Sequence, residues 1–304
     1  MVEFFNWFFR FGDGLPSGEG AYSWQHIVCV CVYMTAMVGL AVLLGLLNRK
    51  KEDKKKNLVL IWAAILIDGF ELIKIIITGV QDVTSLINVL PLFLCSIQLI
   101  TLPVAAFTKG RVKDIALDFV VVFGILGAIT GTVGAAQNYA AYPALSWPNI
   151  VSGITHSISG FASLYIIISG MATLHWKNAP FSLAIMAVFA VIAYVVNVVT
   201  GTTNYMFLMS HDGTPYSIVW EMTAGNPVAY PIIVVLLFVA YLAVFVFVYQ
   251  EIVTKGKICR WIGGKIARLF SKKQTSSTAE PCEEKAAESE VVEEAAATET
   301  PAEE

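Results

Sequence analysis

Residues 228–250, VAYPIIVVLLFVAYLAVFVFVYQ, form a nearly continuous apolar stretch that contains no charged side chain. The hydrocarbon core of a bilayer requires about 20 apolar residues from a helix that crosses it. This stretch therefore predicts a transmembrane helix. Its apolar residues follow one another without a break, whereas the strands of a membrane β-barrel alternate apolar and polar residues.

Six further stretches are also long and predominantly apolar, and all seven together predict an all-α bundle of seven transmembrane helices. The composition agrees, because 57% of the 304 residues are hydrophobic and the mean hydropathy is +0.69. An average soluble domain has only about 45–50% apolar residues. The predicted spans are residues 25–47, 57–79, 86–107, 115–137, 150–174, 181–204 and 228–250.

The Lys and Arg residues of the short loops favour one orientation of this bundle. The loop 48–56, NRKKEDKKK, carries six of them, and Lys109, Arg111 and Lys113 follow the third predicted span. The alternate loops carry none. Because cytoplasmic loops are enriched in Lys and Arg, we expect the N-terminus outside and the C-terminus inside the cell membrane.

Three regions flank the predicted membrane domain, residues 25–251. Residues 1–24 are aromatic and poor in charge, which is typical of a segment lying on the outer membrane surface. Residues 252–273 space apolar side chains at helical intervals among basic ones, which predicts an amphipathic juxtamembrane helix on anionic lipid. Residues 274–304 contain ten Glu and one Lys, and we expect this acidic tail to be disordered.

Polar side chains within the spans are the main functional signal. An ionisable group at the centre of a span costs about 2.5–3.5 kcal/mol on insertion scales, and such groups often mark function. At 1.5 Å per residue, Cys95, Glu71 and His156 lie ~13, ~12 and ~9 Å below the outer surface. This common depth predicts a polar site that opens outward or laterally. Its members are His26, Asp68, Glu71, Lys74, Cys95, Ser96, Gln98, His156, Asn204 and Tyr205.

The thiol and the imidazole of this set suggest a catalytic pair. Cys95 is the candidate nucleophile and His156 the candidate base, because a thiolate, not a thiol, attacks an ester. Glu71 or Asp68 is expected to orient the imidazole, as the third member of a triad does. Candidate donors to an oxyanion are Ser96, Gln98 and Asn204.

The sequence indicates no metal site and no cofactor. The five cysteines are scattered and show neither zinc-site nor disulfide spacing. We expect no metal and no cofactor, membrane phospholipids as binding partners, and no nucleic acid.

Several short motifs resemble those of the YwaF-like integral membrane proteins, a family related to transmembrane protein 164, an ether-phospholipid acyltransferase. They are YSWQHI before the first span, LPLFLC in the third, SGITHSISG in the fifth and TGTTNYMFL after the sixth. The resemblance implies a nucleophile at Cys95 and a catalytic His at His156. Members often carry a His within two positions of the Cys, whereas Phe93 and Ser96 stand there in this chain.

The leading hypothesis is therefore a multi-pass membrane acyltransferase or acyl-hydrolase that acts on phospholipids. A small-solute or proton-coupled transporter is the first alternative, with Asp68, Glu71, Lys74 and the histidines lining the path. A non-catalytic membrane scaffold is the second, in which the long aromatic loop 205–226 binds an outside partner.

Overall fold

The computed structural model describes residues 1–12, 14–172 and 174–255, and within these ranges the chain is helical and contains no β-strand. The predicted acidic tail and nearly all of the predicted juxtamembrane helix lie outside these residues. Five helical segments are long and apolar enough to cross a membrane. They are Trp24–Asn48, Gly110–Ala141, Trp147–Ile168, Ala179–Thr200 and Ala229–Val253.

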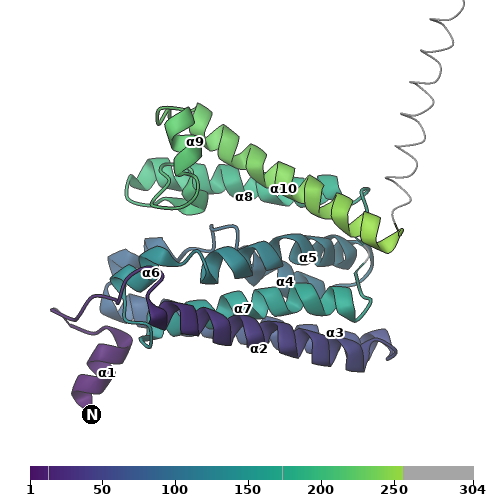
Figure 1. The fold of residues 1–304 in the computed structure, drawn as a ribbon, viewed down its shortest axis with the longest axis horizontal. Helices are drawn as coiled ribbons and strands as arrows, with labels where there is room; N and C mark the ends of the chain where they lie inside the picture. The colour runs from purple at the N-terminus through teal and green to yellow at the C-terminus, as the bar shows by residue number, and fades with distance from the viewer. Residues whose placement is uncertain (13, 173, 256–304) are drawn as a thin grey trace, which may run out of the picture. The chain divides into compact units, whose positions relative to one another are not determined.

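Twelve helical segments follow one another along the described part of the chain (Figure 1). In order they are α1 (Val2–Phe9), α2 (Trp24–Asn48), α3 (Asp53–Gln81), η1 (Val83–Val89), α4 (Gln98–Phe107), α5 (Gly110–Thr132), α6 (Ala136–Ala141), α7 (Trp147–Ile168), α8 (Ala179–Thr200), η2 (Tyr205–Phe207), α9 (Ser217–Met222) and α10 (Ala229–Val253). Helix α3 is 29 residues long, but it carries Asp68, Glu71 and Lys74 and is not among the five apolar segments.

The third predicted span, residues 86–107, is wrong as a continuous helix. The 3₁₀ helix η1 ends at Val89, and α4 begins only at Gln98. Pro91 explains the break, because it lacks an N–H group and disfavours helical backbone at the residue before it. Leu90 is accordingly extended, with φ −62° and ψ 144°. Cys95 thus lies in a run of turns and not on a helix.

Helix α5 is the centre of the packing. It lies between α7 on one side and α8 and α10 on the other (Figure 1). The side chains of Phe119, Val120 and Phe123 are completely buried. Ser163 of α7 donates a hydrogen bond to the carbonyl oxygen of Val121 at 2.6 Å. Because this contact uses a backbone carbonyl, it draws the two helices close together.

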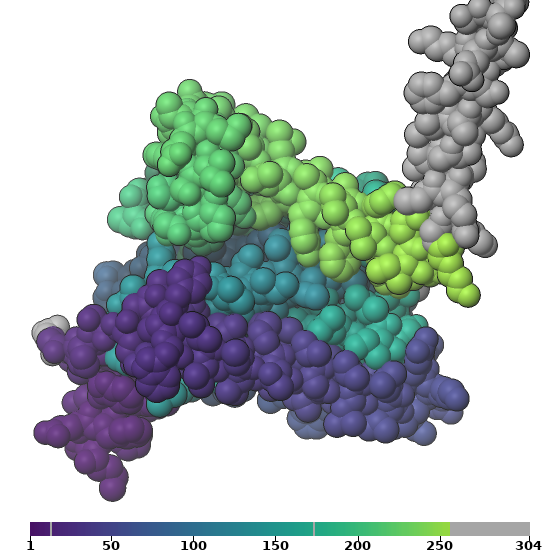
Figure 2. Space-filling view, in the orientation of Figure 1, coloured from purple at the N-terminus to yellow at the C-terminus, as the bar shows by residue number. Residues whose placement is uncertain are grey.

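The chain before α2 packs at one end of this bundle, where it is purple in Figure 2. The N–H groups of Gly18 and Gly20 donate to the carbonyl oxygens of Ala140 and Tyr139, at 3.1 and 2.9 Å. Helix α1 contacts the start of α7, because the rings of Phe8 and Phe9 lie 6.3 and 5.7 Å from the ring of Trp147. The N-terminal segment therefore belongs to the walls of this end of the bundle.

Candidate functional site

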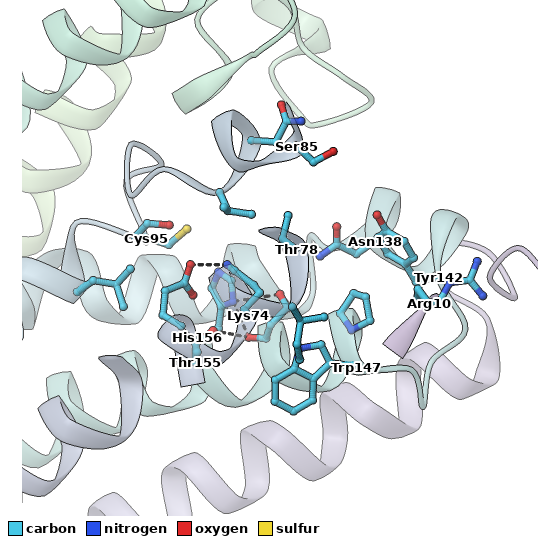
Figure 3. Close-up of a pocket in the computed structure, with 18 of the residues that line it drawn as sticks. Arg10, Lys74, Thr78, Ser85, Cys95, Asn138, Tyr142, Trp147, Thr155 and His156 are labelled. Carbon is cyan, nitrogen blue, oxygen red and sulfur yellow. Dashed lines mark hydrogen bonds and ion pairs between the residues drawn. The ribbon is translucent and has the colours of Figure 1, made fainter. Parts of the chain in front are cut away.

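A cavity of about 470 Å³ lies at this end of the bundle. Its lining comes from the end of α1, from α3, η1, the turns around Cys95, the start of α4, α6 and α7 (Figure 3). Most of its polar groups belong to two helical stripes and to the 3₁₀ helix. They are Glu71, Lys74, Thr78 and Gln81 on α3, Ser85 and Asn88 on η1, and Ser152, Thr155, His156 and Ser159 on α7.

Cys95 and His156 lie side by side in this cavity because α5 presents two glycines to them. A Cβ atom on Gly127 would come within 2.9 Å of the Cβ atom of Cys95. A Cβ atom on Gly131, one turn further along, would overlap Cδ2 and Nε2 of the His156 ring. The two side chains therefore rest on neighbouring turns of α5. Among the ionisable side chains, each of the two also has the strongest electrostatic effect on the other.

The hydrogen bond of the His156 ring fixes its tautomer. Nδ1 lies 2.7 Å from the carbonyl oxygen of Ser152, one turn earlier on α7. A carbonyl oxygen only accepts hydrogen bonds, so Nδ1 of the neutral ring carries the proton. The lone pair then lies on Nε2, the nitrogen that is free to accept a proton from another group. Ser152, and not Glu71 or Asp68, orients this ring.

Glu71 and Lys74 form an ion pair at 2.5 Å within the lining. The Glu71 side chain is 9% exposed and that of Lys74 is 31% exposed, so the ammonium group is the more accessible member. Lys74 also acts electrostatically on both Cys95 and His156. A negative charge that develops beside Cys95 is therefore stabilised by this ammonium group. Asp68 is not part of the lining.

Tyr205 holds the segment that carries Cys95. Its hydroxyl group accepts a hydrogen bond from the N–H of Leu90 at 3.1 Å and donates one to the carbonyl oxygen of Ile87. Its ring packs edge-on against Phe93 at 5.0 Å. Burial raises the pKa of this hydroxyl group, so it remains a donor at neutral pH. Asn197 fixes Tyr205 in turn, through both backbone groups of that residue.

The remaining members of the predicted site lie outside the cavity lining. His26 is 2% exposed, and its Nε2 contacts the carbonyl oxygen of Thr132 at 2.9 Å, which ties α2 to the end of α5. Gln98 is fully buried within α4 and bonds to Thr101. Asn204 organises its own loop through Ser210 and Asp212. The structure therefore brings together Glu71, Lys74, Cys95, Ser96 and His156, with Tyr205 behind the Cys95 segment.

Sequence reasoning missed part of the lining. Thr78 and Gln81 continue the stripe of Glu71 and Lys74 at helical spacing, and that signal was present in the sequence. Arg10 lies on a segment outside every span, and no periodicity points to it. Ser85, Asn138, Tyr142 and Trp147 also lie outside the predicted spans, and Asn88 was missed within the predicted span 86–107.

The described residues hold no cluster of three or more His, Cys, Asp or Glu side chains that could bind a metal ion.

A family model described as the TMEM164 family matches residues 21–249. Comparison with curated proteins finds no match, and comparison with solved structures finds none either. The match includes Cys95, His156 and every cavity residue except those of α1 and its cap.

Proposed function

Because the chain belongs to the TMEM164 family of membrane proteins, we propose that it transfers acyl groups of membrane phospholipids through a thiol nucleophile. The observation that carries this proposal is the pairing of Cys95 and His156 in one polar cavity. Cys95 is the nucleophile and His156 the general base. The substrate is a phospholipid of the bilayer that surrounds the protein.

The reaction proceeds in two balanced steps. Nε2 of His156 takes the thiol proton, and the Cys95 sulfur attacks the carbonyl carbon of an acyl ester. The tetrahedral intermediate collapses, the ester C–O bond breaks, and the imidazolium returns its proton to the departing lysolipid alkoxide. A hydroxyl group of a second lysolipid, or water, then attacks the carbonyl carbon of the thioester, and His156 accepts the proton of this acceptor. The C–S bond breaks, and His156 returns the proton to the sulfur.

The oxyanion of each intermediate needs a donor near Cys95. Of the donors expected from the sequence, only Ser96 lies in the cavity. The Ser96 hydroxyl group interacts with the Cys95 thiol, and the Lys74 ammonium group acts on the same thiol. We assign oxyanion stabilisation to these two side chains.

The proposal includes a topology, which rests on the distribution of basic residues. The Lys-rich loop before α3 and the basic residues at the start of α5 lie on the cytoplasmic side of the cell membrane. The chain between α3 and α5 must then cross the membrane as η1, turns and α4. Irregular backbone is tolerated at membrane depth where it lines a cavity, and Cys95 and Ser96 line this one. The cavity thus opens toward the outer face, with seven crossings and the N-terminus outside.

Thiol labelling tests the activation of Cys95. Cys31 is exposed on α2, whereas Cys95 is only partly exposed. Exposure alone therefore predicts faster alkylation of Cys31. We expect the opposite with a lipid-like iodoacetamide, with Cys95 labelled at least about tenfold faster because His156 removes its proton. Peptide mapping by mass spectrometry gives both rates. Equal rates, or no effect of His156→Ala on the Cys95 rate, would remove the claim of an activated thiol.

Tyr205→Phe tests the tether of the Cys95 segment. The variant removes two hydrogen bonds, so we expect a loss of about 1–3 kcal/mol of unfolding free energy and reduced acyl transfer per folded molecule. Tyr165→Phe is the matched control, since the Tyr165 hydroxyl group donates to the carbonyl oxygen of Lys56 at 3.0 Å, away from the cavity. We expect the control to lose stability and keep its specific activity. Identical specific activities in the two variants would contradict the positioning role.

A further inference from the structure

Arg10 lines the cavity, and its guanidinium group forms no ion pair with a described residue. It caps α1 in the left-handed conformation, with φ 65°. The Gln81 side chain at the end of α3 donates to the carbonyl oxygens of Phe9 and Arg10, the latter at 3.1 Å. The guanidinium group lies 5.7 Å from the centre of the Tyr142 ring. No acidic side chain of the described residues forms an ion pair with it.

Two buried donors of this lining have no hydrogen-bond partner among the described residues. They are Nη1 of Arg10 and the indole Nε1 of Trp147. A guanidinium group and an indole N–H only donate, so a group that satisfies them must be an acceptor. Leaving such donors unpaired costs free energy, which a bound acceptor would recover. Each of these donors can therefore contact an acceptor that a bound ligand brings into the cavity.

The charges of the lining specify the kind of acceptor. Its charged side chains are Arg10, Lys74 and Glu71, and Glu71 already pairs with Lys74. Among the described lining residues the positive charge of Arg10 is therefore not compensated, and Arg10 lies at the end of the cavity away from Cys95 (Figure 3). Arg binds phosphate oxygens well, because its planar group can donate two parallel hydrogen bonds. Asn138 and Tyr142 add polar groups beside it.

We propose that Arg10, together with Trp147, binds the phosphate group of the phospholipid whose acyl ester reaches Cys95. This inference rests on the proposed acyl transfer and restricts its substrates to phosphate-bearing glycerolipids, since a neutral acylglycerol leaves both donors unpaired. The glycerol backbone then bridges the two ends of the cavity. Arg10 precedes residues 21–249, so the family match does not supply this contact.

Binding in the Cys95→Ala protein separates recognition from chemistry. Native mass spectrometry of the full chain would compare phosphatidylcholine with the diacylglycerol of the same acyl chains. We expect Arg10→Gln to weaken phosphatidylcholine binding about tenfold or more, because a charged hydrogen bond is lost, and to leave diacylglycerol binding unchanged. Arg10→Lys should retain part of the affinity. Arg49→Gln, which removes an exposed guanidinium group at the end of α2, is the matched control and should change neither.

Two results would overturn the inference. In the first, Arg10→Gln binds phosphatidylcholine as tightly as Arg49→Gln does. In the second, it loses both lipids equally, which would indicate a structural role. Competition with glycerophosphocholine and with inorganic phosphate distinguishes the sources of the anion. We expect both to compete only at far higher concentration than the lipid, whereas equal competition would show a site for a free anion and would refute a headgroup subsite.

The two proposals can fail separately. Arg10-dependent binding of phosphatidylcholine in a protein that never turns over phospholipid would keep the phosphate contact of Arg10 and end the acyl-transfer proposal. Turnover that depends on Cys95, with lipid binding that is unchanged in Arg10→Gln, would keep the acyl-transfer proposal and end the phosphate contact of Arg10.

Discussion

Cys95→Ala is expected to lower phospholipid acyl transfer by about 10⁴-fold or more, since removal of a catalytic nucleophile leaves only binding and electrostatic assistance. The measurement is acyl transfer from a labelled phospholipid to lysolipid in reconstituted vesicles. The loss should appear in kcat, because the methyl group of alanine still fits the place of the Cys95 Cβ atom against Gly127.

Cys31→Ala is the control for this variant. It removes a free thiol that is exposed on α2 and does not line the cavity. We expect its activity and its thermal unfolding to match those of the unmodified chain. Acyl transfer that persists in Cys95→Ala would show that the reaction, if the protein performs it, uses another group.

His156→Ala is expected to lower the same activity by about 10²–10⁴-fold, the range for a general base. The thiol of this variant keeps its proton at neutral pH, so activity should recover partly as the pH of the assay rises. His211→Ala is the control, because this imidazole belongs to the loop between α8 and α9 and does not line the cavity. A flat pH profile with unchanged kcat would contradict the role of the base.

Gly131→Ala probes the same pair without touching a functional group. Its new Cβ atom would overlap Cδ2 of His156, so the ring must move away from its present position. We expect the substitution to reproduce much of the loss caused by His156→Ala. Gly39→Ala is the matched control, because a methyl group added there would meet no atom within 4 Å. Its activity should be unchanged.

Apolar length was sufficient to locate most of the membrane helices. The span predicted at 228–250 corresponds to α10, Ala229–Val253, and the one predicted at 25–47 corresponds to α2, Trp24–Asn48. In these helices each backbone group bonds within the segment, so composition and length decide the structure. The same reasoning failed at 86–107. Hydropathy does not register the missing N–H of Pro91, which ends the 3₁₀ helix and leaves Cys95 among turns.

The candidate site was predictable only in part, because depth in the membrane is a single coordinate. The predicted depth placed Cys95 and His156 at the level of Glu71 and Lys74, and the cavity contains all four residues. It also grouped them with His26 and Asn204, which lie elsewhere around the bundle. Lateral position depends on helix packing, which one sequence does not specify. Arg10 was missed for a related reason, since only the docking of α1 on Trp147 brings it to the cavity.

The most direct test is to trap the acyl-enzyme. The reconstituted protein would be mixed with phospholipid, without lysolipid acceptor, quenched in acid and analysed by intact-protein and peptide mass spectrometry. We predict one fatty-acyl adduct per chain, carried by the peptide that contains Cys95, sensitive to neutral hydroxylamine and absent from Cys95→Ala. Phospholipid turnover without any adduct on Cys95, or an equal adduct on the chain that lacks this thiol, would contradict the account.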